Sequence, residues 1–362
     1  MKRVIICADG TWNDRDQVDE KTKKRRPTNV TKVARAVLPR AKDGTDQVVY
    51  YHDGVGTGGG MDKLTGGAFG HGMEDNIRNL YRFLVYNYEE NDELHFFGFS
   101  RGAFTVRSLA GFMRKVGLIQ KDDDYYVPEI YHCYETNKGP GTPEWEKAFH
   151  NVRGTRPCPP IRFIGVWDTV GALGAPGLIG QIFNSGKYKY HDVGLHDAIQ
   201  NAAHALAIDE RRRPFAPDIW TKPAGWGGNL EQAWFPGVHS NVGGGYAPDG
   251  VANEALHWIV EKAADHGLEF DDAYLAHFLP CFNSLLVDNM TLAYRALIPK
   301  ERKLGEHAQD GETVHQAAID RMDLPACAYG PGNLTAYLAQ PGRAQPANTA
   351  RIERGEPCAD LP

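Results

Sequence analysis

Short apolar runs alternate with helix-periodic segments along the first two thirds of this 362-residue chain. The runs are apolar nearly throughout, which is typical of strands buried on both faces of a parallel sheet. Helical segments between such strands form right-handed β-α-β units. The pattern therefore predicts an α/β fold with a mostly parallel, doubly wound sheet. We expect its strands at residues 3–8, 47–51, 93–99, 161–167 and 233–238.

Three helices are expected within this alternation. Residues 73–89 carry apolar side chains at spacings of three and four, which gives the helix one apolar face. Residues 102–118 are apolar almost all round, so this helix should be central and largely buried. A further helix is expected near residues 195–208.

Two segments fit the alternation poorly. Residues 122–160 are rich in Tyr, Pro, Gly and charge, and residues 171–226 begin with a glycine-rich apolar stretch. We expect both to be lid insertions over the carboxyl edge of the sheet, where α/β sheets bind ligands. The chain is thus predicted to form one domain over residues 1–336. Residues 337–362 show no periodicity, so a flexible tail is expected there.

Charge and cysteine content exclude several classes of protein. The chain has 40 Lys and Arg against 46 Asp and Glu, and its net charge of −6 is not that of a dedicated nucleic-acid binder. The six cysteines form no C-x-x-C pair, so neither a disulfide scaffold nor a zinc knuckle is expected. The first apolar run ends at Asp9, which is too short for a signal peptide, and no stretch has the composition of a transmembrane helix. A cytoplasmic protein is expected.

The strongest local motif is Gly98-Phe99-Ser100-Arg101-Gly102, which reads G-x-S-x-G between a predicted buried strand and a predicted buried helix. A nucleophile elbow requires this context. Its tight turn lifts the serine Oγ clear of the sheet, and the helix amino terminus beneath it favours negative charge. A Cβ on either glycine would clash with the neighbouring strand or helix. We predict that Ser100 is a nucleophile; the alternative is a serine that caps the helix.

A serine nucleophile needs a base that accepts its proton and an acid that orients the base. In this fold the acid and then the histidine follow the serine along the chain, each just past a strand. Asp168 directly follows a predicted strand and is our choice for the acid, with Asp209 and Asp53 in reserve. His239 follows an apolar strand and enters a glycine-rich loop, so we choose it as the base. His315 is the second choice.

The tetrahedral intermediate of ester hydrolysis needs two backbone donors. One is the N–H of Arg101, the residue after the serine. The other is expected from Gly10 and Thr11, in the loop after the first strand, with Asp9 bracing that loop by accepting backbone N–H bonds. The loop also resembles the D-x-D-G-T pattern of a phosphatase. Cys7 stands where that pattern has its nucleophilic aspartate, which disfavours this alternative.

Two further glycine-rich stretches are candidates for the pocket wall. Residues 53–60 look like a phosphate cradle but lack the G-K-[ST] ending of a P-loop, so we interpret them as a loop that lines the pocket. Residues 170–183 are uncharged and follow the proposed acid. They are either an apolar flap that shields an acyl chain and contacts a lipid interface, or an internal loop packed on the core.

Together these motifs resemble a large α/β-hydrolase family that includes the catalytic domains of type VI secretion phospholipase effectors. The resemblance spans roughly residues 3–325 and rests on segments 7–13, 53–57, 98–103, 166–171, 204–212 and 235–239. It implies a triad that maps onto Ser100, Asp168 and His239. Where the family usually reads His-Ser-Asp, this chain has Asn241, so it would have to rely on Asp168 as the acid.

These features predict a serine esterase or lipase that uses no metal or organic cofactor. The expected partners are a small ester or lipid substrate and, transiently, a membrane surface, but no nucleic acid. The resemblance implies phospholipid as substrate and, for an effector, export by a specialised secretion system with a secretion or immunity partner. Two alternatives stay open: a non-catalytic binding module on the same scaffold, and an acyltransferase that uses the same triad.

Overall fold

A computed structural model describes the chain over residues 1–11, 13, 15–18, 23–54, 66–171, 192–350 and 358. Within these ranges, seven strands form one parallel sheet, with the order β2-β1-β3-β6-β7-β8-β9. The strands are β1 (Arg3–Ala8), β2 (Gln47–His52), β3 (Glu93–Phe99), β6 (Ile161–Trp167), β7 (Asn201–Ala207), β8 (Asn229–Phe235) and β9 (Glu312–Val314).

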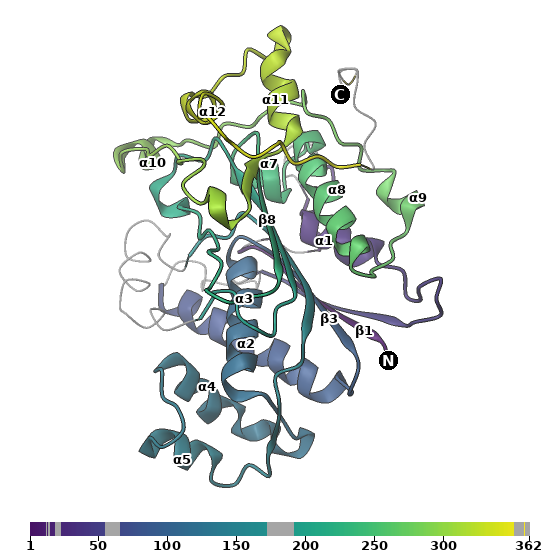
Figure 1. The fold of residues 1–362 in the computed structure, drawn as a ribbon, viewed down its shortest axis with the longest axis vertical. Coiled ribbons are helices and arrows are strands. Elements are labelled where there is room, and N and C mark those ends of the chain that lie inside the picture. The colour runs from purple at the N-terminus through teal and green to yellow at the C-terminus, as the bar shows by residue number, and fades with distance from the viewer. Residues whose placement is uncertain are drawn as a thin grey trace.

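Helices cover both faces of this sheet (Figure 1). Leu94 and Phe96 of β3 pack into one layer, and Phe97 and Phe99 pack into the other, so the central strand is buried on both faces. The predicted doubly wound α/β fold is confirmed. The first layer contains α2 (Gly66–Asn87), α3 (Arg101–Val116) and α4 (Val127–Glu135), and the second contains α1 (Asn29–Ala36), α8 (Gly250–Asp265) and α9 (Asp272–Leu275).

Shorter elements complete the described part of the chain. No helix in it combines the length and the apolar character needed to cross a bilayer. The short helices are η2 (Lys121–Tyr126), α5 (Pro143–Phe149), η3 (Arg213–Phe215), α7 (His239–Gly243), α10 (Leu292–Ala296), η4 (Ala308–Asp310), α11 (Gln316–Asp323), η5 (Pro325–Cys327) and α12 (Gly332–Leu338). The remaining strands, β4 (Leu118–Ile119) and β5 (Thr155–Arg156), pair antiparallel.

The strand order changes direction next to β1. β2 lies on one side of β1, whereas β3 and all later strands lie on the other side. Open α/β sheets bind their ligands at such a switch point, beyond the carboxyl ends of the strands. The loops that leave β1 at Asp9 and β3 at Ser100 meet there. The topology therefore places the predicted serine where this class of sheet builds its sites.

The strand predictions agree with the structure except in three places, the first of which is β9, a strand that was not predicted. The fifth strand lies at Asn229–Phe235 rather than 233–238, and the helix predicted near residues 195–208 is wrong. Residues 201–207 form β7, a central strand between β6 and β8. Four of its seven residues are alanine, the strongest helix former, so local propensity misleads here. Burial between two parallel neighbours decides the strand conformation.

The insertion at residues 122–160 does not lie over the carboxyl edge of the sheet. α3 starts at that edge, after Ser100, and its 16 residues span about 24 Å, so the chain leaves α3 at the opposite edge. There α4 and α5 pack beside α2 and α3, far from α7 in Figure 1. The lid interpretation is therefore wrong for this insertion. Much of the second insertion, residues 172–191, lies outside the described residues.

The C-terminal segment is packed on the domain as far as residue 350. α12 buries Leu334 and Tyr337 against the third core cluster. Further on, the fully buried Thr349 hydroxyl lies 3.1 Å from Nε2 of His315. The flexible tail predicted from residue 337 is therefore wrong for residues 337–350. Much of this segment is held by individual contacts rather than by a regularly spaced apolar face. Its packing therefore could not be predicted from a periodic pattern in the sequence.

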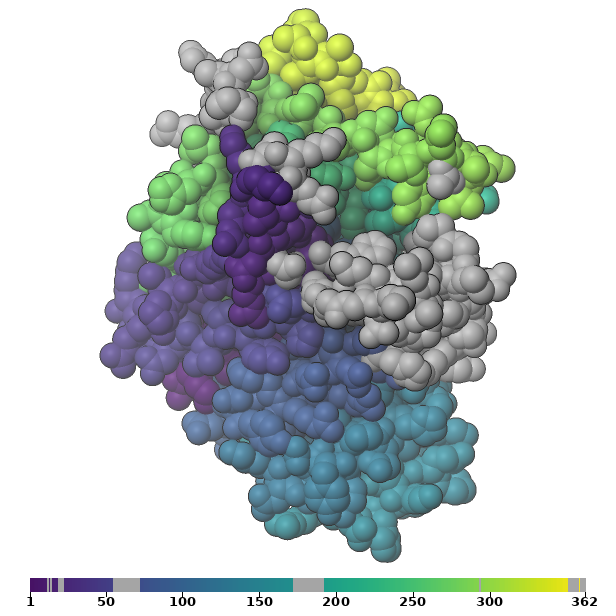
Figure 2. Space-filling view, turned by 180° about the vertical axis from the view of Figure 1, so that it is seen from behind, coloured from purple at the N-terminus to yellow at the C-terminus, as the bar shows by residue number. Residues whose placement is uncertain are grey.

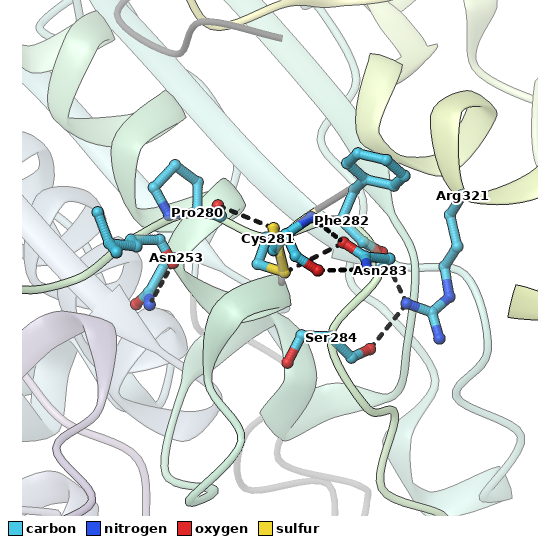
Figure 3. Close-up of a disulfide and its surroundings, with 9 residues drawn as sticks. Asn253, Pro280, Cys281, Phe282, Asn283, Ser284 and Arg321 are labelled. Atoms are coloured by element: carbon cyan, nitrogen blue, oxygen red, sulfur yellow. Dashed lines mark hydrogen bonds between the residues drawn. A yellow bond between two sulfur atoms is a disulfide. The ribbon is translucent and has the colours of Figure 1, made fainter. Parts of the chain in front are cut away.

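A disulfide joins Cys358 to Cys281, with their Cα atoms 5.9 Å apart (Figure 3). The Asn283 side chain accepts the Cys358 N–H at 3.0 Å and donates to the Cys358 carbonyl at 3.2 Å. Arg321 donates to the carbonyl of Phe282 at 2.6 Å, which fixes the same turn. The two cysteines are 77 residues apart in sequence, and their spacing gave no reason to pair them.

Candidate active site

Ser100 occupies the turn between β3 and α3 in a backbone conformation that is strained for any residue with a Cβ, with φ 58° and ψ −123°. A Cβ on Gly98 would lie 2.6 Å from the Cα of Ala103 in α3. A Cβ on Gly102 would lie 2.1 Å from the carbonyl oxygen of Ala8 at the end of β1. The clashes predicted at both glycines are confirmed. The turn has the geometry that a nucleophile elbow requires.

Asp168 and His239 come from neighbouring parts of the same sheet edge. Asp168 follows β6 directly and is fully buried, and His239 is the first residue of α7, four positions after β8 ends. Their side chains meet, with Nδ1 of His239 2.5 Å from Oδ2 of Asp168. Because a carboxylate only accepts hydrogen bonds, Nδ1 carries the proton and Nε2 is the nitrogen left to act as a base.

Arg302 is a second partner of Asp168, and the sequence analysis missed it. Its Nη1 and Nη2 lie 2.5 and 3.0 Å from the two carboxylate oxygens, a bidentate pair. The same nitrogens donate to the carbonyl oxygens of Ala207 at 2.8 Å and Phe215 at 2.6 Å. The Arg302 side chain is only 4% exposed. It lies 134 residues after Asp168, in a segment without a recognisable motif.

This arrangement sets the charges of the pair. Burial alone would raise the pKa of Asp168, but the Arg302 guanidinium and the His239 bond hold it well below its usual range, so the carboxylate is ionised. Burial lowers the pKa of His239, and Asp168 offsets this only in part. Glu210 also offsets the effect of burial, whereas the nearby Arg212 guanidinium adds to it. His239 is therefore a neutral imidazole at neutral pH, the form that a general base needs.

The His239 ring lies beside the serine turn. Phe99, the residue before Ser100, contacts this ring with centroids 4.7 Å apart, and Phe215 packs edge-on against it at 5.0 Å. The described residues include no hydrogen bond between Ser100 Oγ and His239. Catalytic hydrogen bonds are often long before a substrate binds. The structure thus brings the serine, histidine and aspartate to one edge of the sheet without closing the serine–histidine contact.

Three buried side chains fix the loops that carry the pair. His204 Nε2 accepts the N–H of Thr169 at 3.1 Å, and burial lowers the pKa of His204 to about 3, which keeps that nitrogen an acceptor. Glu210 accepts the backbone N–H of His239 at 3.3 Å. Asn241 accepts the N–H of Val238 at 3.1 Å and so caps α7. The Asn241 side chain therefore shapes the turn that precedes His239.

The reserve residues have other contacts. Asp209 accepts the N–H of Gly237 at 2.5 Å and fixes the loop that leads to His239. Asp53 forms a half-exposed ion pair with Arg15 at 3.4 Å. His315 is fully buried and caps α11. Among these alternatives, the structure brings none into the Asp168–His239 pair.

The loop after β1 lies against the serine, since a Cβ on Gly10 would lie 3.2 Å from the Cβ of Ser100. Asp9 accepts the Gly10 N–H at 2.7 Å, so this N–H is not free for an oxyanion, contrary to our prediction. The Thr11 hydroxyl is buried and has no hydrogen-bond partner among the described residues. Asp9 accepts a backbone N–H of this loop, as predicted, and its other oxygen accepts hydrogen bonds from the hydroxyls of Thr28, Thr31 and Tyr51.

A cleft of about 590 Å³ is lined by neighbours of the His239–Asp168 pair, although Ser100, Asp168 and His239 do not line it themselves. Phe215 and Arg302 line it, together with residues from the loops 210–219 and 300–307. Of the glycine-rich stretches considered for the pocket wall, residues 55–60 and 172–183 lie outside the described residues. No cluster of three or more His, Cys, Asp or Glu side chains in the described part of the chain is arranged to hold a metal ion.

The parallel sheet, the strained serine turn and the buried histidine–aspartate pair define an α/β-hydrolase-like protein. The chain belongs to the family described as T6SS, phospholipase effector Tle1-like, catalytic domain, whose model matches residues 2–262. The match includes Ser100, Asp168 and His239. It ends before Arg302.

Comparison with individual proteins gives more distant relatives. The chain is 27% identical over 239 residues to the uncharacterized protein YEL023C of Saccharomyces cerevisiae, a match that covers 59% of this chain and 32% of the yeast protein. The crystal structure of an uncharacterized protein from Pseudomonas aeruginosa aligns with a TM-score of 0.50 and 18% identity, over 78% of this chain and 49% of that one. A structure of the Tle1 effector bound to the VgrG spike of the type 6 secretion system aligns with a TM-score of 0.37 and 20% identity, over 68% of this chain and 52% of that one. The chain thus spans about a third of the yeast relative and half of the Pseudomonas protein.

Proposed function

We propose that this chain is a serine hydrolase that cleaves the carboxylic esters of lipids or phospholipids. Ser100 is the nucleophile, His239 the base and Asp168 the acid that orients it. One observation carries the proposal: the Asp168 carboxyl lies 2.5 Å from Nδ1 of His239 at the sheet edge where Ser100 occupies a strained turn. The family supports lipid as the substrate class, because its description names phospholipase effectors.

The proposed reaction proceeds through an acyl-enzyme. His239 Nε2 takes the Ser100 proton while Oγ attacks the ester carbonyl carbon, and the resulting oxyanion accepts hydrogen bonds from the Arg101 N–H and from Thr11. The tetrahedral intermediate collapses as His239 gives the proton to the leaving alcohol. Water then attacks the acyl-enzyme, with His239 again accepting a proton, and the free carboxylic acid leaves. Each bond to carbon that forms is matched by one that breaks.

The proposal also covers the limits of the catalytic domain and the compartment in which the protein acts. The segment after residue 262 belongs to the same domain, because Arg302 contacts Asp168 directly. We propose export through a type VI secretion system, with secretion and immunity proteins as partners, on the basis of the family. The Cys281–Cys358 disulfide fits this, since disulfides persist in oxidising compartments.

Hydrolysis in H₂¹⁸O tests the proposal. The purified chain is incubated with vesicles of phosphatidylcholine, phosphatidylethanolamine and phosphatidylglycerol, and products are identified by mass spectrometry. Attack on a carboxylic ester through Ser100 places one ¹⁸O in the released fatty acid. Label in a phosphate product would indicate phosphodiester cleavage instead. Fatty acyl transfer to an added alcohol without free acid would favour the acyltransferase, and no turnover with any lipid or ester would favour a binding module.

The acid limb of the pH profile is expected to lie below pH 6.5, the ordinary pKa of histidine. His239 works as a base only when neutral, and burial lowers its pKa, so the active form persists to lower pH. The measurement is kcat/KM for a soluble p-nitrophenyl ester from pH 4.5 to 8.5. An acid-limb midpoint above 7 would contradict this account of the charges.

Replacing Arg302 with methionine is expected to lower kcat about 10²-fold, because Asp168 loses the two donors that hold it in place. The unneutralised carboxylate should also raise the pKa of His239, so the acid limb moves to higher pH. Arg302→Lys keeps the charge but loses the bidentate fork, so an intermediate effect is expected.

Arg321→Met is the matched control for this variant. As whole residues, Arg321 and Arg302 are both 6% exposed, but Arg321 donates to carbonyl oxygens of the turn beside the disulfide. This control should lower the melting temperature without moving the acid limb. If Arg302→Met lowered only the melting temperature and left the acid limb in place, Arg302 would have a purely structural role.

A further inference from the structure

Half of the large apolar side chains that are exposed in the described part of the chain lie in one short stretch of sequence. Of the ten such side chains exposed among the described residues, five lie within positions 279–298. The most exposed of these five are Leu292 at 86%, and Leu285 and Ile298 at 70% each. Single exposed apolar residues are normal on a protein surface, but a cluster of them marks an interaction site. We refer to residues 291–300, which contain α10, as the α10 segment.

Ile298 is also strained. It ends the turn after α10 with φ 55°, the left-handed region that glycine or asparagine adopts most easily. A β-branched residue in this region is an outlier, and here its side chain gains little burial in return. Strained residues of this kind concentrate at functional sites. Glycine or asparagine at this position would adopt the same backbone conformation with less strain. We therefore take the isoleucine to indicate a contact outside the chain.

The charged side chains within the α10 segment are positive, and Asp288 and Glu301 are the nearest acidic residues in sequence on either side of it. The α10 segment contains Arg295 and Lys300 and no acidic residue, in a chain whose net charge is −6. The Lys300 N–H bonds to the carbonyl of Arg211 at 3.0 Å, which brings the exposed Arg211 alongside. Exposed apolar side chains framed by basic ones are the features with which proteins bind the surface of anionic lipid membranes.

The segment is also coupled to the candidate active site. It lies at the outer edge of the molecule, beside the label α10 in Figure 1 and in the lime-green region of Figure 2. The Tyr294 ring packs edge-on against Phe215 at 6.2 Å, and Phe215 contacts the His239 ring at 5.0 Å. Lys300 lines the same 590 Å³ cleft as Phe215. A surface that meets the α10 segment therefore lies next to the cleft beside His239.

We propose that the α10 segment docks the protein on an anionic lipid surface. Leu292 and Ile298 enter the boundary between head groups and acyl chains, while Arg295 and Lys300 contact lipid phosphates. The docked orientation presents the cleft beside His239 to lipid in the surface. The purpose of docking rests on the proposed hydrolase function, but the binding itself can be measured without catalysis.

Vesicle binding tests the proposal directly. The Ser100→Ala protein, which leaves the lipid intact, is sedimented with vesicles of phosphatidylglycerol and phosphatidylcholine. Adding Leu292→Ser and Ile298→Asn should weaken binding at least tenfold, whereas the melting temperature should stay the same or rise, because asparagine accepts the left-handed conformation. Arg295→Glu with Lys300→Glu should weaken binding to these anionic vesicles and leave binding to pure phosphatidylcholine unchanged.

The matched control is Tyr86→Ser with Tyr125→Ser, which removes two exposed aromatic rings near η2, away from α10. It should bind vesicles like the parent. Equal binding by the Leu292/Ile298 variant, or an equal loss in the control, would overturn the proposal. If the Leu292/Ile298 changes instead convert a dimer to a monomer and leave vesicle binding intact, the segment binds a second copy of the chain.

Kinetics with Ser100 restored separate this inference from the proposed function. The Leu292/Ile298 variant should hydrolyse a dissolved short-chain ester within about twofold of the parent rate, but lose at least tenfold on anionic vesicles. Loss on both substrates, with a normal melting temperature, would contradict a docking role. The protein could instead bind vesicles through the α10 segment and yet hydrolyse no ester. That result would support the docking inference and refute the proposed hydrolase function.

Discussion

Replacing Ser100 with alanine is expected to lower kcat/KM for ester hydrolysis by about 10⁴- to 10⁶-fold. The reason is chemical: alanine has no oxygen to attack the ester, so only uncatalysed attack by water remains. The fold should be unaffected, because the described structure gives Ser100 Oγ no hydrogen bond to lose. The measurement is the rate on a soluble p-nitrophenyl ester together with the melting temperature.

Ser108→Ala is the control for this variant. Ser108 lies on the same helix, α3, is fully buried, and its hydroxyl has no hydrogen-bond partner among the described residues. It should retain the activity of the parent. If Ser100→Ala also retained that activity, Ser100 would not be the nucleophile, and its strained turn would need another explanation.

Replacing His239 with alanine is expected to cost nearly as much as losing the serine. Without an imidazole, the Ser100 hydroxyl keeps its proton and is a poor nucleophile at neutral pH. The buried Asp168 retains Arg302 as a partner, so the fold should survive the change. The double variant, Ser100→Ala with His239→Ala, should be no slower than either single variant, because residues that act as a unit are not additive.

His257→Ala is a suitable control, since this half-buried histidine on α8 bonds the carbonyl of Phe278. Its activity should stay within a few-fold of the parent. If the two losses multiplied in the double variant of Ser100 and His239, the residues would act independently. A general base for the serine would then have to come from elsewhere in the chain.

The parts of the account that could be predicted from sequence depend on short, contiguous patterns. The strand before Ser100, its two flanking glycines and the helix after it are read from one contiguous stretch, residues 93–118. Asp168 and His239 each follow a strand, and parallel strands bring their carboxyl ends to one edge. The parallel topology of the sheet therefore explains why Asp168 and His239 lie close enough to pair.

The missed features depend on contacts between segments far apart in sequence. Arg302 reaches Asp168 from a segment without periodicity, and Cys358 reaches Cys281 across 77 residues. β7 was misassigned because its alanines favour a helix, while the sheet on both sides imposes a strand. The Gly10 donor was lost for a local reason that sequence does not show: the side chain of Asp9 turns back to accept that N–H.

Covalent labelling of the intact protein tests the central claim most directly. The chain is treated with a fluorophosphonate, digested and sequenced by mass spectrometry, in parallel with the Ser100→Ala and His239→Ala variants. We predict a single adduct on the Oγ of Ser100, formed rapidly in the parent, much more slowly in His239→Ala and not at all in Ser100→Ala. Ester hydrolysis by a protein that takes up no label at Ser100, or that takes it up equally fast without His239, would contradict the account.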